Sequence, residues 1–149
     1  MLRQLNMKFF ILALIAVAIL SVFILFLPGG EKFEISPSLD EEFRLKVGEK
    51  ALVRGVELVL VINKVIEDSR CPINVYCFWS GKVTVEISVA KRGRYVETVN
   101  LTMPGAEKRE LDCYTIILTD VKPQREYPDR LEIPQSSYEI TLKISQKTC

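Results

Sequence analysis

The pattern that most constrains this chain is the spacing of its apolar residues from residue 43 onward. In segment 83–89, valine or isoleucine occupies every odd position and a polar residue every even one. A period of two is typical of a β-strand with one buried face, whereas helices repeat every 3.6 residues. Further apolar or alternating runs lie at 43–47, 56–66, 114–121 and 138–145, with turn residues between them. About seven short strands of this kind predict an all-β fold, a small antiparallel β-sandwich.

A second feature lies before this region. The nineteen residues from Phe9 to Leu27 contain one polar residue, Ser21. As a helix they would span about 28 Å, close to the roughly 30 Å of a bilayer core. Arg3 and Lys8 precede the block, which places the short N-terminal side in the cytoplasm. The predicted organisation is a cytoplasmic tail at 1–8, a transmembrane anchor at 9–27, a juxtamembrane stalk at 28–42 and an extracytoplasmic domain at 43–149.

An alternative for the N-terminal block is a cleaved signal peptide. Ala16-Val17-Ala18 fits the small-residue pattern of a cleavage site. It lies in the middle of the block, however, so cleavage there would leave a strongly apolar mature end. A single-pass protein of the cell membrane is therefore the preferred reading. No cysteine lies directly after the block, so a lipidated cysteine anchor is excluded.

The charges of the chain argue against several functions. The chain has twenty basic and nineteen acidic residues, and this balance is atypical of nucleic-acid-binding domains. Histidine is absent, and the sequence has no glycine-rich phosphate loop. The carboxylate pairs Glu41-Glu42 and Glu67-Asp68 point to opposite faces of a strand. We therefore expect no enzyme, no cofactor and no metal. Scarce amides beside dense mixed charge are typical of thermophilic sources.

Four cysteines, Cys71, Cys77, Cys113 and Cys149, all follow the predicted anchor. An even number outside the cell predicts two disulfides, with three pairings open. Zinc is the alternative, but five residues separate the first two cysteines and no histidine is available.

One register favours the pairs Cys71–Cys77 and Cys113–Cys149. If 114–121 and 138–145 are antiparallel neighbours, aligning their apolar positions sets Cys113 opposite Cys149. The predicted pairs are Ile116 with Gln146, Leu118 with Ile144 and Asp120 with Leu142. The rival pairings would join Cys71 or Cys77 to the last strands.

The turn at 91–93 has the residues of a three-residue hairpin loop, with Gly93 in the left-handed position. The resulting pairs are Val89 with Tyr95, Val85 with Val99 and Val83 with Leu101. A two-residue loop would turn Asn100 and Thr102 toward the core. In the preferred register Asn100 faces outward, where Asn100-Leu101-Thr102 is a candidate N-glycosylation site.

The segment between the second and third long strands has the most distinctive sequence. Its notable residues are Asp68, Ser69, Arg70, Cys71, Pro72, Tyr76, Cys77, Phe78, Trp79 and Gly81. The pattern D-S-R-C-P-x4-C-x-W-x-G resembles that of a family of small, uncharacterised exported proteins of bacteria and archaea, many of them lipoproteins. The strand at 43–48 and the late elements 120–123 and 137–138 are also similar. The resemblance implies an exported β-domain and brings no activity with it.

Two interpretations of this segment remain open. In the structural one, the disulfide and Pro72 stiffen a loop, Arg70 stacks on Trp79 or pairs with Asp68, and the Trp79 indole packs on the disulfide. In the functional one, Arg70, Tyr76, Phe78 and Trp79 form an exposed recognition patch, since such residues dominate binding hot spots. Redox chemistry is disfavoured because no C-x-x-C is present.

The sequence thus predicts a non-enzymatic, membrane-anchored module that binds a protein or another part of the cell envelope. An accessory subunit of a membrane complex is the second hypothesis, with Ala13, Ala16 and Ala18 permitting close helix packing. An extracellular enzyme with a dispersed acid–base site is the third.

Overall fold

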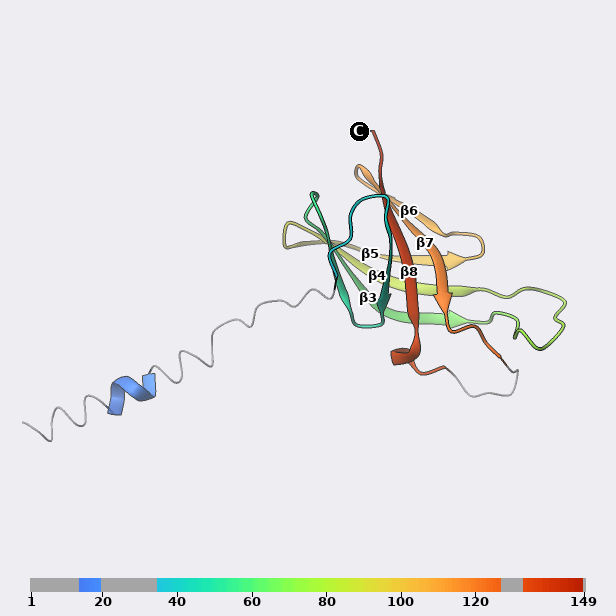
Figure 1. Cartoon of the computed structure of the whole chain (residues 1–149), viewed down its shortest axis with the longest axis horizontal. Helices are drawn as coiled ribbons and strands as arrows, with labels where there is room; N and C mark the ends of the chain where they lie inside the picture. Colours follow the sequence, from blue (N-terminus) through green and yellow to red (C-terminus); the bar gives the residue numbers. More distant parts are fainter. Residues whose placement is uncertain (1–13, 20–34, 127–132, 149) are drawn as a thin grey trace, which may run out of the picture. The chain divides into compact units, whose positions relative to one another are not determined.

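The computed structural model describes residues 14–19, 35–126 and 133–148 (Figure 1). The chain divides into two units, Met1–Glu31 and Lys32–Cys149. The described residues of the second unit form eight strands and one 3₁₀ turn: β1 Glu42–Lys46, β2 Lys50–Val53, β3 Leu58–Asp68, β4 Val83–Lys91, β5 Arg94–Met103, β6 Lys108–Leu111, β7 Tyr114–Lys122, η1 Gln135–Ser137 and β8 Glu139–Gln146.

The strands form two four-stranded antiparallel sheets. One has the order β1-β8-β7-β6 and the other β2-β3-β4-β5. The predicted all-β, two-sheet fold is therefore confirmed, with eight strands in place of about seven. The sequence pattern did not show two of the strands, β2, which has only four residues, and β6, whose residues KREL are mostly exposed. An exposed edge strand needs no apolar alternation, so the pattern gave no signal for it.

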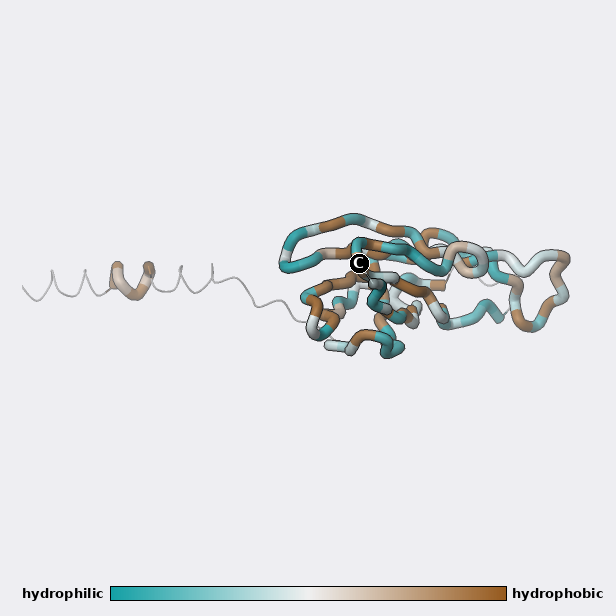
Figure 2. The backbone as a smooth tube through the Cα atoms, turned by 90° about the horizontal axis from the view of Figure 1, so that it is seen from above, coloured by the Kyte–Doolittle hydropathy of each residue, from teal (hydrophilic) through white to brown (hydrophobic). Residues whose placement is uncertain are grey.

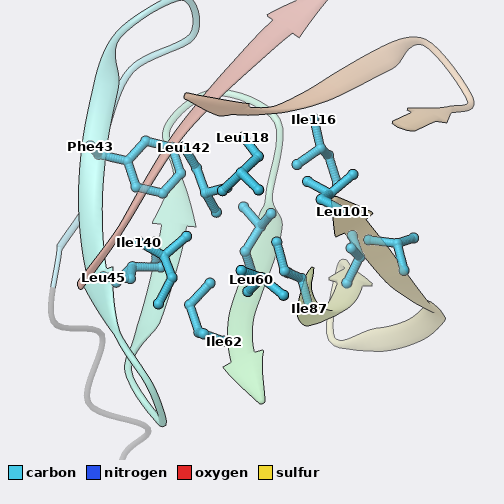
Figure 3. Packing of buried hydrophobic residues seen from close by; sticks show 14 of the residues in the cluster. Phe43, Leu45, Leu60, Ile62, Ile87, Leu101, Ile116, Leu118, Ile140 and Leu142 are labelled. Carbon is cyan, nitrogen blue, oxygen red and sulfur yellow. The ribbon is translucent and has the colours of Figure 1, made fainter. Parts of the chain in front are cut away.

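The core lies between the two sheets, because each long strand turns its alternate residues inward. In β4 the buried positions are every second residue from Val83 to Val89. Figure 3 shows Leu60, Ile87 and Leu101 of one sheet packed opposite Ile116, Leu118 and Leu142 of the other. The period-two pattern therefore specifies this core directly.

The β4–β5 hairpin differs from the predicted three-residue loop. Arg92 and Gly93 form a two-residue turn, and both have positive φ, 50° and 71°. A bulge then inserts Val96 between the pairs Ala90–Tyr95 and Val89–Glu97. The extra residue restores the side-chain parity that a two-residue loop alone would reverse. Val99 and Leu101 thus face the core as predicted, although the predicted pairs are wrong by two residues.

The β7–β8 register also differs from the prediction by two residues. The strands are neighbours as expected, but Ile116 pairs with Ile144 and Leu118 with Leu142. Apolar residues thus oppose apolar residues, where the predicted register left Ile116 opposite Gln146. In this register the amide of Lys147 donates to the carbonyl of Cys113 at 2.7 Å. Lys147, rather than Cys149, is therefore level with Cys113.

The chain joins the sandwich before β1. Ile35 forms a parallel bridge with Ala51, and the Arg54 amide donates to the Pro37 carbonyl at 2.9 Å. Pro37 is buried. Part of the segment assigned to the stalk is therefore hydrogen-bonded to β2.

In the first unit the described residues, 14–19, are helical with exposed side chains. Among the described residues, no helix combines the length and apolar character needed to cross a membrane. The predicted anchor at 9–27 lies mostly outside the part of the chain that the structure describes.

Candidate functional site

The β3–β4 loop, residues 69–82, projects beyond the ends of the sheets at one end of the sandwich (Figures 1 and 2). Its first residues continue the strand pair, because Ser69 N donates to Lys82 O at 2.8 Å and Cys71 N to Ser80 O at 2.9 Å. The Cys71–Cys77 disulfide closes the outer part, with the two Cα atoms 6.0 Å apart. This bond confirms one predicted pair and excludes the rival pairings.

Gly81 allows the two sides of the loop to approach. Its φ is +66°, and a Cβ at this position would collide with the backbone carbonyl of Ser69. Glycine is therefore required for both its conformation and its small size.

Arg70 anchors the base of the loop. Its Nε and Nη2 donate to the two carboxylate oxygens of Asp68 at 2.8 and 2.7 Å. Nη1 and Nη2 also donate to the carbonyls of Val121 and Pro123 at 2.6 and 2.7 Å. The Arg70 and Asp68 side chains are only 16% and 7% exposed. A guanidinium with its donors satisfied in this way holds the loop to the end of β7.

Tyr138 completes this arrangement from the opposite side. Its hydroxyl donates to Oδ2 of Asp68 at 3.0 Å, and the residue is buried. We call these three residues the Asp68–Arg70–Tyr138 clamp. Gln135, beside it, bonds the amide and the carbonyl of Val65 with its side-chain amide, at 2.8 and 3.0 Å. Residues 70 positions apart in the sequence therefore join β3 to the start of β8.

The clamp perturbs two ionisations. Burial acts to raise the pKa of Asp68, but the hydrogen bonds and positive charge of Arg70 outweigh it, and the pKa lies below its usual value. Burial and the nearby Asp68 carboxylate raise the pKa of Tyr138 to about 12. Both shifts favour the ionic form of Asp68 and the protonated form of Tyr138 at neutral pH.

The segment 121–126 supports one side of the loop. Ile73 N donates to Arg125 O at 2.9 Å, and Asn74 Nδ2 donates to Glu126 O at 3.2 Å. Arg125 in turn donates to the Asp68 carbonyl at 3.4 Å. The segment 121–126, which is distant in the sequence, thus holds the backbone of the loop in position.

The aromatic side chains of the loop point away from this support. Tyr76, Phe78 and Trp79 are 97%, 98% and 76% exposed. Ile73 and Val75 are exposed as well. We call these five residues the loop tip. The expected packing of the Trp79 indole on the disulfide does not bury it, because the loop extends past both sheets and no second layer of the described residues covers it.

The motif therefore separates into two groups. Asp68, Arg70 and Gly81 hold the loop in place, whereas Tyr76, Phe78 and Trp79 are displayed to solvent. Of the two contacts expected for Arg70, stacking on Trp79 or pairing with Asp68, the structure shows the pairing with Asp68. Sequence reasoning missed Gln135 and Arg125 and placed Tyr138 only within a similarity to other proteins. A buried tyrosine beside a carboxylate has no local sequence signal when the partners are 70 positions apart.

The remaining predicted residues lie elsewhere. Asn100 is exposed on β5, opposite Glu86, so the glycosylation site stays a prediction. Cys113 is disulfide-bonded, and its predicted partner Cys149 lies outside the described residues. In the described part of the chain, no three His, Cys, Asp or Glu residues are grouped so that they could hold a metal ion.

Comparisons with protein-family models, with curated proteins and with solved structures found no match to this chain.

Proposed function

We propose that this protein is a membrane-anchored binding module whose recognition surface is the loop tip. Residues 9–27 hold the chain in the cell membrane, and the sandwich lies on the extracytoplasmic side. The module acts by contact, without catalysing a reaction. The observation that carries the proposal is the exposure of three aromatic side chains on a cross-linked loop.

Large aromatic side chains that are exposed to water point to a binding role. Contiguous apolar groups on a protein surface mark sites of interaction more often than they arise by chance. The loop tip groups five large apolar residues within seven positions. Tyrosine, phenylalanine and tryptophan also supply large contact areas while losing few rotamers on binding.

The rigidity of the loop supports the same function. The disulfide, the Asp68–Arg70–Tyr138 clamp and the contacts of Ile73 and Asn74 all restrain the backbone of the loop. A preorganised loop loses less conformational entropy when it binds, so a larger share of the contact energy appears as affinity. The contacts at the base of the loop therefore keep the exposed side chains of the loop tip in a fixed arrangement.

The sequence and the disulfide both support the proposed compartment. The Cys71–Cys77 bond is typical of an oxidising environment, and the N-terminal apolar block is long enough for a transmembrane helix. The proposal therefore places both disulfides outside the cytoplasm.

Site-specific photo-crosslinking tests the proposal. A photoreactive amino acid at Phe78 should form an adduct in native membranes, because this side chain is 98% exposed at the loop tip. The matched control is the same amino acid at Tyr95, an exposed aromatic position on the hairpin at the other end of β4. Equal adduct yields at both positions, or none at Phe78, would contradict the proposal.

A further inference from the structure

We infer that the partner of the loop tip is the lipid bilayer itself: Tyr76, Phe78 and Trp79 insert into its interfacial layer. This inference rests on the proposed function and names its partner. It follows from the chemistry of the loop tip, from the charges at its base and from the attachment of the domain.

The outer part of the loop carries no charge. The eleven residues Cys71–Gly81 contain no Asp, Glu, Lys or Arg, although these residues make up 26% of the chain. A bilayer interface accepts aromatic rings, with their apolar bodies and polar edges, and strongly disfavours charged side chains below it. Aliphatic Ile73 and Val75 beside the rings suit hydrocarbon better than a sugar or a charged partner.

The loop tip also has the form of a spike rather than of a flat interface. Tyr76 and Phe78 are almost fully exposed, so little protein surface surrounds them. Hot-spot residues in protein interfaces usually lie within a ring of neighbouring contacts that exclude water. A fluid bilayer requires no such ring, because lipid closes around an inserted side chain.

The backbone of the loop is compatible with this position. Val75 N donates to Pro72 O, Cys71 N to Ser80 O and Ile73 N to Arg125 O. Pro72 has no amide hydrogen to satisfy. Internal bonding of this kind lowers the cost of moving peptide groups out of water.

The charges at the base are neutralised in pairs. Lys82 lies 3.1 Å from Glu67, and Lys122 lies 4.0 Å from Asp120. Arg70 is paired with Asp68, and Arg125 is followed by Glu126, so the described residues at the base offer no net positive patch to anionic headgroups. Contact is expected to depend on apolar insertion and to be insensitive to salt and to lipid charge.

Attachment of the chain makes a weak insertion sufficient. The chain joins the sandwich at Ile35, level with Leu60, and the loop begins beyond Asp68, roughly 26 Å further along β3. Seven residues, 28–34, cover at most about 25 Å when fully extended, so a sandwich tethered through them stays close to the bilayer. A tether of this length holds the loop tip at a high effective concentration near the bilayer.

Trp79 is the only tryptophan of the chain and therefore reports directly on this contact. The full chain is placed in nanodiscs of zwitterionic phosphatidylcholine, with bromine on the acyl chains at defined depths. We expect Trp79 emission to shift to shorter wavelength and to lose intensity, most with bromine near the headgroups. Added salt or anionic lipid should leave this loss unchanged.

Two variants separate the loop tip from the rest of the surface. The double variant Tyr76→Ser, Phe78→Ser keeps the reporter and should abolish quenching by the bromolipids. Tyr95→Ser, an exposed aromatic position distant from the loop, should leave it unchanged. Quenching of the wild-type chain by aqueous iodide but not by bromolipids would overturn the inference.

The photo-crosslinking at Phe78 distinguishes this failure from that of the proposed function. Lipid adducts at Phe78 support both statements. Protein adducts without lipid adducts overturn the bilayer contact and leave the binding module in place. The absence of any adduct overturns both.

Discussion

Arg70 and Trp79 lie nine positions apart in one loop, yet their side chains have opposite environments. The Arg70 guanidinium is 16% exposed and donates to a carboxylate and two carbonyls, whereas Trp79 is 76% exposed. Burying the arginine is tolerable because its charge and its donors are satisfied. The indole lies on the loop beyond the ends of both sheets, outside the core that the described residues form. The hydrophobicity of a side chain therefore does not by itself decide whether the side chain is buried; burial also requires a second layer of the fold.

We expect Trp79→Ala to change the free energy of unfolding by no more than about 0.5 kcal/mol, because the substitution leaves no cavity. A buried tryptophan would cost about 3 kcal/mol or more. Thermal or urea denaturation measures the difference. A large loss of stability would show that the indole packs against the domain.

Gly81→Ala should destabilise the domain by about 2 kcal/mol or more. An alanine at φ +66° is strained, and its Cβ meets the Ser69 carbonyl. Gly93→Ala is the matched control, since a Cβ there meets nothing within 4 Å and only the strain of φ +71° remains. Equal losses in the two variants would contradict the close approach at Gly81.

The Asp68 carboxyl makes stability depend on acid. Its pKa is lower in the folded state than the ordinary value of 3.8, so folding favours the ionised form. The resulting stability is present above pH 3.8 and is lost as the pH falls through the lowered pKa. Asp68→Asn should be less stable at pH 7 and should lose less of its remaining stability on acidification. Parallel acid titrations of the two proteins by circular dichroism measure this difference.

Tyr138 has the converse effect in alkali. Its pKa rises from 10.0 to about 12 on folding, so the proton is held more tightly in the folded state. This stability is present below pH 10 and is lost as the pH rises toward about 12. Tyr138→Phe should remove that part of the alkaline dependence, whereas Tyr95→Phe should leave it. Identical alkaline curves for wild type and Tyr138→Phe would contradict the interaction with Asp68.

At the scale of elements, the β4–β5 hairpin shows how a bulge and a turn act together. A two-residue turn with positive φ at Arg92 and Gly93 matches the twist of the strands. Alone it would bring the wrong face of β5 to the core, and the bulge at Val96 corrects this. The burial of Val99 and Leu101 stabilises this combination of turn and bulge. Arginine itself is unfavourable in the left-handed conformation at position 92.

Arg92→Asn should therefore stabilise the domain by roughly 0.5 kcal/mol, because asparagine tolerates positive φ better than arginine. The ion pair with Glu57 is lost, but its partners are 79% and 69% exposed and it contributes little. Arg94→Asn, in the adjacent strand, is the control and should be neutral or destabilising. The denaturation midpoints of the two variants, compared with wild type, test this prediction. An Arg92→Asn variant that is less stable than wild type would contradict it.

At the scale of the whole molecule, two kinds of contact join the sheets. The apolar core extends across both, and its buried hydrophobic residues all lie between Phe43 and Ile144. Polar contacts cross at the margins, where Arg109 of β6 lies 3.2 Å from Glu97 of β5 and Tyr138 reaches Asp68. Within the described residues of the second unit, the two sheets are therefore joined by one apolar core and by polar contacts at its margins.

Protease added to right-side-out vesicles should release a folded fragment that begins after Gly30. Cleavage there lies before Ile35 and leaves the core from Phe43 to Ile144 intact. Mass spectrometry identifies the new terminus, and circular dichroism shows whether the fragment keeps its β structure. A protein that is soluble before proteolysis and starts near residue 19 or 31 would identify the N-terminal block as a cleaved signal.

Among the features that the sequence alone determined are the long strands, the two-sheet class and the inward face of β4, whereas it favoured the Cys71–Cys77 pair and left the rival pairings open. The strand features depend on neighbours within a few positions, because the period of two assigns each residue to a face. The same local reasoning recognised residues 68–81 as the distinctive segment. It left their structural and functional interpretations undecided.

Only the tertiary structure decided the registers, the clamp and the exposure of the loop tip. Bulges at Val96 and in β7 shift strand pairs without changing which residues are apolar, so the pattern cannot reveal them. Tyr138 meets Asp68 across 70 positions, a distance in sequence that only chain folding spans. Trp79 is exposed because both sheets end before the loop, and burial depends on a second layer that no local pattern encodes.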